Sequence, residues 1–342
     1  MSYQIQLLAD GQTFTANDEQ TVIDAALDAC VALPLGCRAG VCGACKGKVV
    51  SGEFDLAGYG EAVLSAAERE AGFTLLCRTR ARSDLVLDVP KAERDANKPQ
   101  KMPARISRLE RLSEDVMRVD LQLPASETFD FRAGQYIDIS IGDGEHRSFS
   151  IANPPERKGI IELHIRLVPG GKFTQHVFSD MKARDILRIK GPLGNFYLRE
   201  DSDRPIVLVG GGTGFAPLKS IIEHAIHIGL KRPIALYWGA RNPAGFYMRE
   251  LTQSWQSGLS GFRYIPVVSD TRPDDGWTGR RGMVHEAVRA DYADLSQHEV
   301  YACGAPPMIE AARNAFMRER ALPEDAFFSD AFSFASAPPV KD

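Results

Sequence analysis

The stretch GCRAGVCGAC, residues 36–45, places three cysteines and three glycines within ten positions. The cysteines are Cys37, Cys42 and Cys45, in C-x4-C-x2-C spacing, and Cys77 follows after 31 intervening residues. Glycines at 36, 40 and 43 allow the backbone to adopt positive φ and to approach the sulfur atoms closely. The stretch therefore predicts a tight loop that gathers thiolates around one ligand.

These cysteines could form a disulfide framework, a structural zinc site or an iron–sulfur cluster. A disulfide framework ranks last, because the N-terminus has no basic segment followed by a long apolar core, and thiols stay reduced in the cytoplasm. A structural zinc site usually shows two CxxC-like pairs, whereas here one pair stands with a long loop and a lone partner. C-x4-C-x2-C with a distant fourth cysteine is the plant-type [2Fe–2S] spacing. We therefore predict Cys37, Cys42, Cys45 and Cys77 as ligands of a [2Fe–2S] cluster.

The residues flanking this loop predict a small α+β domain over residues 1–90. Residues 3–16 form a predicted β-hairpin with an Asp-Gly turn, and residues 18–33 a helix. Cys30 falls at helical spacing with the apolar residues of that helix, so we expect it on the buried face and outside the site. A strand over 46–52, a short helix opened by Ser65 and Glu68, and a strand over 73–79 that carries Cys77 complete the domain. The polar, proline-bounded residues 91–102 predict a linker.

The bulk composition limits the class of protein. A chain of 342 residues is most simply divided into two or three domains. Its net charge of −4, with 25% charged and 44% hydrophobic residues, gives no indication of nucleic-acid binding. No window has the apolar length that a membrane span needs. We expect a cytoplasmic protein that binds neither nucleic acid nor membrane.

Residues 103–200 predict an all-β domain. Apolar residues recur there at alternate positions, and Gly, Pro and Asp turns separate the short strands, which suggests a small closed barrel. The alternating positions are Val119, Leu121, Leu123, Tyr136, Ile137, Ile139, Ile161, Leu163, Ile165, Ile186 and Ile189.

Residues 201–342 change to continuous apolar runs that alternate with helical stretches. This pattern predicts βαβ units around a parallel sheet, with ligands at the carboxyl ends of the strands. His224 and His227 lie in one predicted helix without a third ligand in view, so we expect them on the helix surface.

Two segments of the barrel region favour a flavin site. HRSFSIAN, residues 146–153, supplies an arginine for a pyrophosphate, an aromatic ring to stack on a flavin, and a hydroxyl for flavin N5. On its own this pattern is more often an ordinary strand, with one face in solvent and the other in the core. PGGKFTQHVFSDM, residues 169–181, predicts a helix capped near Thr174, whose N-terminus would bind the same pyrophosphate. The candidate FAD-binding residues are Arg147, Ser148, Phe149, Ser150, Gly170, Gly171, Lys172 and Thr174.

A nicotinamide site is predicted at the strand ends of the last domain. VLVGGGTGFAPLKS, residues 207–220, is a buried strand, a glycine loop and a helix beginning near Pro217, although it does not match G-x-G-x-x-G. As a bare feature the loop could be a packing turn, and Cys303 a buried core thiol. The candidate nicotinamide-binding residues are Gly210, Gly211, Gly212, Thr213, Gly214, Arg241, Cys303 and Gly304.

Together these motifs resemble the ferredoxin-fused flavin reductases of the ferredoxin–NADP reductase superfamily, over about residues 3–332. The resemblance implies a multidomain chain: a plant-type [2Fe–2S] ferredoxin domain of β-grasp fold, a six-stranded antiparallel β-barrel that binds FAD, and a C-terminal parallel-sheet α/β domain for NAD(P). It also implies that Cys303 lies near the nicotinamide and that Phe332, in the terminal FFSDAF, covers the flavin.

The family resemblance predicts an electron path from NADH to FAD beside Ser150, then to the cluster, and on to an electron-accepting partner protein. We expect NADH rather than NADPH, and a monomer. Segments 276–288 and 301–312 favour a CDP-6-deoxy-4-hexulose-3-dehydrase as the partner, with an aromatic-ring oxygenase as the alternative. A redox sensor without turnover and a reductase that releases free flavin are the competing functions.

Overall fold

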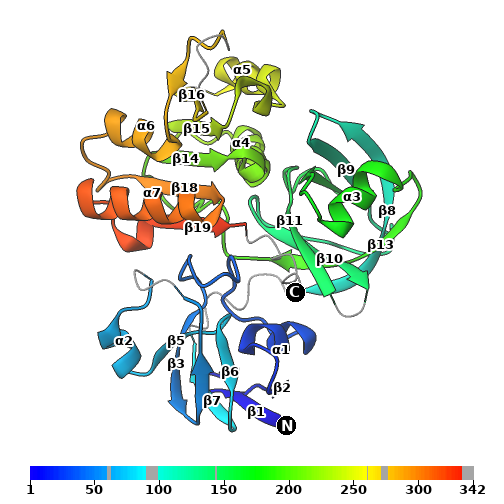
Figure 1. The fold of residues 1–342 in the computed structure, drawn as a ribbon, viewed down its shortest axis with the longest axis vertical. Helices are drawn as coiled ribbons and strands as arrows, with labels where there is room; N and C mark the ends of the chain where they lie inside the picture. The colour runs from blue at the N-terminus through cyan, green and yellow to red at the C-terminus, as the bar shows by residue number, and fades with distance from the viewer. Residues whose placement is uncertain (60–62, 90–98, 143–144, 260, 271–275, 333–342) are drawn as a thin grey trace, which may run out of the picture. The chain divides into compact units, whose positions relative to one another are not determined.

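The computed structural model describes residues 1–59, 63–89, 99–142, 145–259, 261–270 and 276–332 (Figure 1). The chain divides into two compact units, of which the first is Met1–Lys101 with Lys190–Asn195. The second is Met102–Ile189 with Phe196–Asp342. The predicted linker over 91–102 lies largely outside the described residues, and a strand already begins at Gln100.

The first unit contains a five-stranded sheet in the order β2-β1-β7-β3-β5 and a two-stranded sheet, β4-β6. The predicted hairpin is confirmed, since β1 pairs antiparallel with β2, and Ser65 and Glu68 form a complete capping box. Apolar residues at alternate strand positions and on one face of α1 fill the core. The elements are β1 (Ser2–Leu7), β2 (Thr13–Asn17), α1 (Val22–Asp28), β3 (Lys46–Ser51), β4 (Phe54–Leu56), α2 (Ala66–Glu70), β5 (Phe73–Leu75), β6 (Thr79–Ala81) and β7 (Leu85–Asp88).

Cys30 does not lie on the buried face of α1, which corrects the sequence prediction. The helix ends at Asp28, and Cys30 is exposed with a φ of 55°. Its N–H donates to Leu27 O, and Val31 N–H donates to Ala26 O. This is a Schellman C-cap with cysteine at the left-handed position that glycine usually occupies.

The barrel consists of six antiparallel strands in the order β11-β10-β13-β8-β9-β12. A bridge between Ile151 and Leu163 joins the two outer strands and closes it. Most of the predicted alternating residues are buried, but Ile186 is 68% exposed because it opens β13 on the outer face, while Ile189 is 2% exposed. The elements are β8 (Gln100–Arg111), β9 (Val116–Gln122), β10 (Tyr136–Gly142), β11 (Glu145–Ser150), β12 (Ile160–Arg166), α3 (Lys172–Ser179) and β13 (Ile186–Leu193).

The last domain is built on a parallel sheet in the order β17-β16-β15-β14-β18-β19, as predicted. Because the strand order reverses after β17, right-handed connections put α4 and α5 on one face and α6 and α7 on the other (Figure 1). The strands are β14 (Ile206–Gly211), β15 (Ile234–Ala240), β16 (Phe262–Val268), β17 (Arg280–Arg281), β18 (Glu299–Gly304) and β19 (Phe327–Ala331). The α-helices are α4 (Phe215–His227), α5 (Arg249–Gly258), α6 (Val284–Asp291) and α7 (Pro306–Glu319), and short 3₁₀ turns are η1 (Gly212–Gly214), η2 (Pro243–Gly245) and η3 (Glu324–Ala326).

Helix α4 differs from its prediction in where it begins and in the burial of His224. It begins at Phe215, two residues before Pro217, because η1 leads directly into it. His224 is not a surface residue: it is 7% exposed, and its ring nitrogens lie 2.7 Å from Glu156 Oε1 and 3.1 Å from Glu200 Oε1. Within the described part of the chain, no helix has the length and apolar character needed to cross a membrane.

Candidate functional site

The four predicted cluster cysteines are buried in the first unit and come as two pairs. A hydrogen bond with Cys42 lowers the pKa of Cys37 to about 6, and the same contact, with burial, raises the pKa of Cys42. A hydrogen bond with Cys77, again with burial, raises the pKa of Cys45. Cys77 lies in the turn after β5 rather than on a strand, which corrects that part of the prediction.

This pairing suits a binuclear cluster. A [2Fe–2S] cluster takes four cysteine ligands, two on each iron. Cys37 Sγ also accepts the N–H of Ala39 at 3.3 Å, and Cys37 N–H points to Cys42 Sγ at 3.4 Å. Amide donors of this kind tune the potential of iron–sulfur clusters.

The glycines of the loop have the roles that the sequence suggested, in two different ways. Gly40 and Gly43 have φ of 76° and 80°, in the left-handed region. Gly36 instead lets Cys42 and Ala44 pack closely against the backbone, because a Cβ built there would lie 2.7 Å from Cys42 Sγ and 2.8 Å from Ala44 Cβ.

We expect Gly36→Ala to reduce the iron and acid-labile sulfide bound per chain, because the added methyl group displaces Cys42 Sγ. Gly11→Ala is the control for strain away from the cluster, since Gly11 is also in the first unit and has a φ of 70°, so alanine strains the backbone there, but its Cβ meets nothing within 4 Å. Iron content after purification measures the effect. Equal iron content in both variants would show that Cys42 does not need that space.

Ser150 is suited to a ligand in the barrel. It ends β11, it is 7% exposed, and its Oγ is buried without a hydrogen-bond partner among the described residues. A buried hydroxyl without a partner costs about 1–3 kcal/mol unless a ligand supplies one. This orphaned hydroxyl fits the predicted contact with flavin N5.

The structure brings the two predicted flavin segments together. The rings of Phe149 on β11 and Phe173 on α3 lie 5.5 Å apart. Helix α3 is preceded by Gly170, with φ of 75°, and has Gly171 as its N-cap, with no side-chain cap in the described structure. Thr174 is therefore inside the first turn and not the cap; its Oγ accepts the N–H of Val168 at 3.1 Å. An uncapped helix N-terminus beside a glycine is a suitable anion site.

The polar side chains of this region are accessible. Arg147 is half-buried, and its guanidinium donates to His146 O at 2.9 Å and to Glu145 at 3.2 Å. Ser148 Oγ donates to Asp138 Oδ1 at 2.7 Å. Lys172 opens α3 and is exposed.

The glycine loop, residues 210–214, meets Cys303 at the carboxyl edge of the parallel sheet. Gly210 is the register partner of Cys303, and a Cβ on Gly214 would lie 2.1 Å from Cys303 O, so only glycine fits there. Gly211 and Gly304 both face Met308. Burial raises the pKa of the Cys303 thiol well above its usual value, and Asp330 adds to that rise.

Two further residues at this edge were missed by the sequence analysis. Asp330, 6% exposed, is the register partner of Cys303 on β19. Arg166 ends β12, and its Nη1 lies 3.1 Å from the Cβ position of Gly212, so a cation stands beside the predicted phosphate loop. The positions of Asp330 and Arg166 near strand ends could have indicated that they belong to the site. Neither residue lies in a glycine-rich motif, so neither was predicted.

Arg241 and Phe332 are placed at the same edge of the sheet. Arg241 follows β15 directly and is exposed, and its carbonyl accepts the N–H of Asp270 at 2.8 Å. Phe332, the last described residue, packs on the domain core, and its N–H donates to Gly304 O at 2.8 Å.

Comparisons with known proteins agree with this division of the chain. Three family models match: a 2Fe-2S iron-sulfur cluster binding domain over residues 5–82, an oxidoreductase FAD-binding domain over 103–197, and an oxidoreductase NAD-binding domain over 208–314. Together they cover most of the chain.

Similar proteins match over nearly the full length. CDP-6-deoxy-L-threo-D-glycero-4-hexulose-3-dehydrase reductase of Yersinia pestis is 41% identical over 335 residues, 97% of this chain and 99% of that protein. Reductase component 2 of terephthalate 1,2-dioxygenase from a Comamonas species is 36% identical over 340 residues, with 97% and 98% covered. A solved structure of the ferredoxin reductase in carbazole 1,9a-dioxygenase has a TM-score of 0.74 at 26% identity, covering 97% of this chain and 99% of that one.

Proposed function

Because the chain belongs to the family of reductases that join a [2Fe–2S] ferredoxin domain to FAD-binding and NAD-binding domains, we propose that its electron acceptor is a CDP-hexulose dehydrase. The observation that carries this proposal is the 41% identity, over 97% of the chain, with a reductase named for that dehydrase. The chain is an oxidoreductase in any case, since its relatives are reductase components.

The residues of each domain have separate tasks in this proposal. Bound FAD would supply the conversion between the electron pair of the nicotinamide and the single electrons that an iron–sulfur cluster accepts. The amides of residues 210–214 bind the nicotinamide pyrophosphate, with Arg166 beside them. Ser150 donates its hydroxyl toward flavin N5, and the two thiol pairs hold the irons. Cys303, buried and neutral, forms part of the apolar wall against the nicotinamide.

Turnover with purified partners tests the choice of acceptor. With NADH as the only reductant, we expect the protein to support formation of the 3-deoxy product by the CDP-hexulose dehydrase. Product formation with a terephthalate-type oxygenase, together with none from the dehydrase, would overturn the proposal.

The oxygenase is the second candidate acceptor. Two of the comparisons above carry dioxygenase names, and one of those is 36% identical over nearly the whole chain. The same turnover experiment therefore decides between the two candidates.

Steady reduction of an added one-electron dye by NADH separates the reductase from the competing functions. A redox sensor would lose its colour with NADH and then stop without turnover. A reductase that releases free flavin would lose FAD in gel filtration. We expect turnover with FAD retained, and elution as a monomer of 37.6 kDa. We propose the reducing cytoplasm as the location, since the six cysteines, all within the described residues, form no disulfide.

We propose NADH as the preferred donor, with kcat/KM roughly tenfold or more above that for NADPH. Arg241 follows β15 and is exposed. Its guanidinium would therefore make one solvent-exposed contact with the adenosine half of the bound dinucleotide. Arg241→Ala should then lower kcat/KM for both donors by the same factor, roughly two- to fivefold. Arg318→Ala, an exposed change on α7, is the control. Loss of NADPH use alone in the Arg241 variant would show that Arg241 binds a 2′-phosphate.

A further inference from the structure

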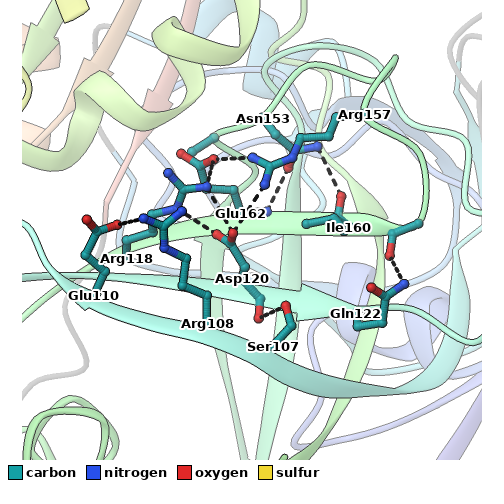
Figure 2. A network of polar contacts seen from close by, with 12 residues as sticks. Ser107, Arg108, Glu110, Arg118, Asp120, Gln122, Asn153, Arg157, Ile160 and Glu162 are labelled. Atoms are coloured by element: carbon teal, nitrogen blue, oxygen red, sulfur yellow. Dashed lines mark hydrogen bonds and ion pairs between the residues drawn. The ribbon is translucent and has the colours of Figure 1, made fainter. Parts of the chain in front are cut away.

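A cluster of charged residues lies where α4 of the nicotinamide domain packs on the barrel. Asp120, Glu162 and Lys219 are each 5% exposed or less, and the other members are partly buried. Figure 2 shows Asp120 and Glu162 between the guanidinium groups of two arginines. We call these three basic and three acidic residues the ionic cluster: Arg118, Asp120, Arg157, Glu162, Lys219 and Glu223.

Glu162 is the centre of the ionic cluster. Its Oε2 accepts from Arg118 at 2.9 Å and from Arg157 at 2.8 Å, and its Oε1 lies 3.2 Å from Lys219 Nζ. His164 Nε2 lies 3.0 Å from the same Oε1. Burial alone would raise the pKa of Glu162, but the bond from His164 and the neighbouring cations hold it below its usual value. Glu162 is therefore an ionised carboxylate, and each of these four side-chain partners is a donor.

Lys219 links the two parts of the second unit. Its Nζ lies within 3.2 Å of three acceptors, namely Ala152 O at 3.1 Å, Glu223 at 2.9 Å and Glu162. An ammonium group has three protons, so all are used. Lys219 belongs to the helix that begins directly after the glycine loop, and Ala152 is two residues beyond Ser150. The neighbouring Ser220 adds a second bond to the same segment, donating to Asn153 O at 2.7 Å.

A second route leads from Glu162 to the glycine loop. Because a carboxylate only accepts, His164 Nε2 carries the proton, and Nδ1 accepts the hydroxyl of Tyr247 at 3.1 Å. The Tyr247 ring packs edge-on against Trp238 with centroids 5.2 Å apart, and Trp238 Nε1 donates to Gly212 O at 2.9 Å. Glu162 is thus connected both to α4 and to the loop that precedes it.

Stability alone does not account for this arrangement. Burying ion pairs costs desolvation energy, and well-packed apolar residues in their place are often as stable or more so. The hydrogen bonds of Glu162 to Lys219 and His164 are directional, so they define one position of α4 along the barrel. An apolar contact would allow α4 to shift. Hydride transfer requires reacting atoms about 3–3.5 Å apart, and a misplacement of about 1 Å can cost roughly 100-fold in rate.

We propose that Glu162 and Lys219 are positioning residues for hydride transfer, which fix the glycine loop, residues 210–214, relative to Ser150. They contact neither cofactor in this account; they act through α4, Ala152 and the His164–Tyr247–Trp238 route. The inference rests on the proposed use of NADH and FAD in this unit.

The test compares Lys219→Met and Glu162→Gln with the controls Lys231→Met and Glu310→Gln, which change exposed residues of the same domain. In anaerobic single-turnover mixing, we expect flavin reduction at saturating NADH to slow by roughly 10- to 100-fold in both test variants. The Kd of NADH and the FAD content should stay within about twofold, because the binding groups are intact. The slowing in the double variant should be smaller than the product of the two single effects, since the Glu162–Lys219 ion pair is common to both changes.

A purely structural role gives a different result. In that case the variants would have a lower Tm and a lower FAD content. The protein that retains FAD would still reduce its flavin at the wild-type rate at saturating NADH, and this result would overturn the proposal. Should Lys219→Met not fold, Lys219→Arg keeps the charge but changes the geometry, and an unchanged rate in that variant overturns the proposal equally.

Hydrogen exchange of the protein without NADH gives a readout that does not depend on activity. We expect faster exchange of amides in residues 206–227 in Lys219→Met than in Lys231→Met, and equal exchange would contradict the inference. If wild-type protein failed to oxidise NADH, the proposed function would fail, while this exchange experiment would still decide whether the ionic cluster fixes α4.

Discussion

Replacing Cys42 by Ser is expected to abolish NADH-driven reduction of a protein acceptor while leaving flavin reduction by NADH intact. Cys42 pairs with Cys37, and two thiolates are needed on each iron. The flavin and nicotinamide residues belong to the other unit of the chain, so they do not depend on this thiol for their fold. Stopped-flow bleaching of the flavin and steady-state reduction of the acceptor measure the two steps separately.

Cys30→Ser is the matched control for that experiment. Cys30 is in the same unit, but it is exposed at the end of α1 and has no part in the two thiol pairs. It should retain wild-type iron content and acceptor reduction. If Cys42→Ser still reduced the acceptor, the four-cysteine site would not lie on the electron path. If it lost flavin reduction as well, the cluster would be needed for the fold of the whole chain.

Ser150→Ala should slow flavin reduction by NADH roughly 10- to 100-fold with FAD still bound. A hydrogen bond to a group on which charge develops in the transition state contributes about 1.5–3 kcal/mol, and each 1.4 kcal/mol is about a factor of ten in rate. The Ser150 hydroxyl is buried without a hydrogen-bond partner among the described residues, so removing it breaks no hydrogen bond there. The rate at saturating NADH in single-turnover mixing is the measurement.

Ser140→Ala is the control for this second change, because Ser140 is an exposed hydroxyl on β10 of the same barrel. The two variants should retain equal amounts of FAD and differ only in the rate of flavin reduction. Equal rates would exclude Ser150 from the hydride-transfer site, and loss of FAD in Ser150→Ala would assign the hydroxyl to binding instead.

The parts of the site that follow from local backbone chemistry could be predicted from the sequence. The spacing of Cys37, Cys42, Cys45 and Cys77 indicated the cluster, because a short glycine-containing loop determines where the first three thiols lie. Glycine loops after buried strands likewise indicated the parallel sheet and its carboxyl edge. In both cases the signal lies within a few neighbouring residues.

Features that depend on tertiary contacts were missed. Glu162 and His164 alternate with buried Leu163, so a two-residue period assigns them to the outer face of a barrel strand; there they meet α4, about 60 residues later in the chain. His224 was assigned to the helix surface because no third ligand was in view, whereas its partners Glu156 and Glu200 come from other parts of the chain. Cys30 was assigned to a helix face because its spacing fitted, whereas a C-cap one residue earlier turned it outward.

An anaerobic titration with NADH, followed by visible absorption and electron paramagnetic resonance, tests the central claim most directly. The claim is that electrons from NADH reach the site of Cys37, Cys42, Cys45 and Cys77 only through FAD. We expect the signal of a reduced [2Fe–2S] cluster to appear after the flavin bleaches, and to be absent when FAD has been removed. A cluster that stays oxidised after full flavin reduction, or that NADH reduces without FAD, would contradict the claim.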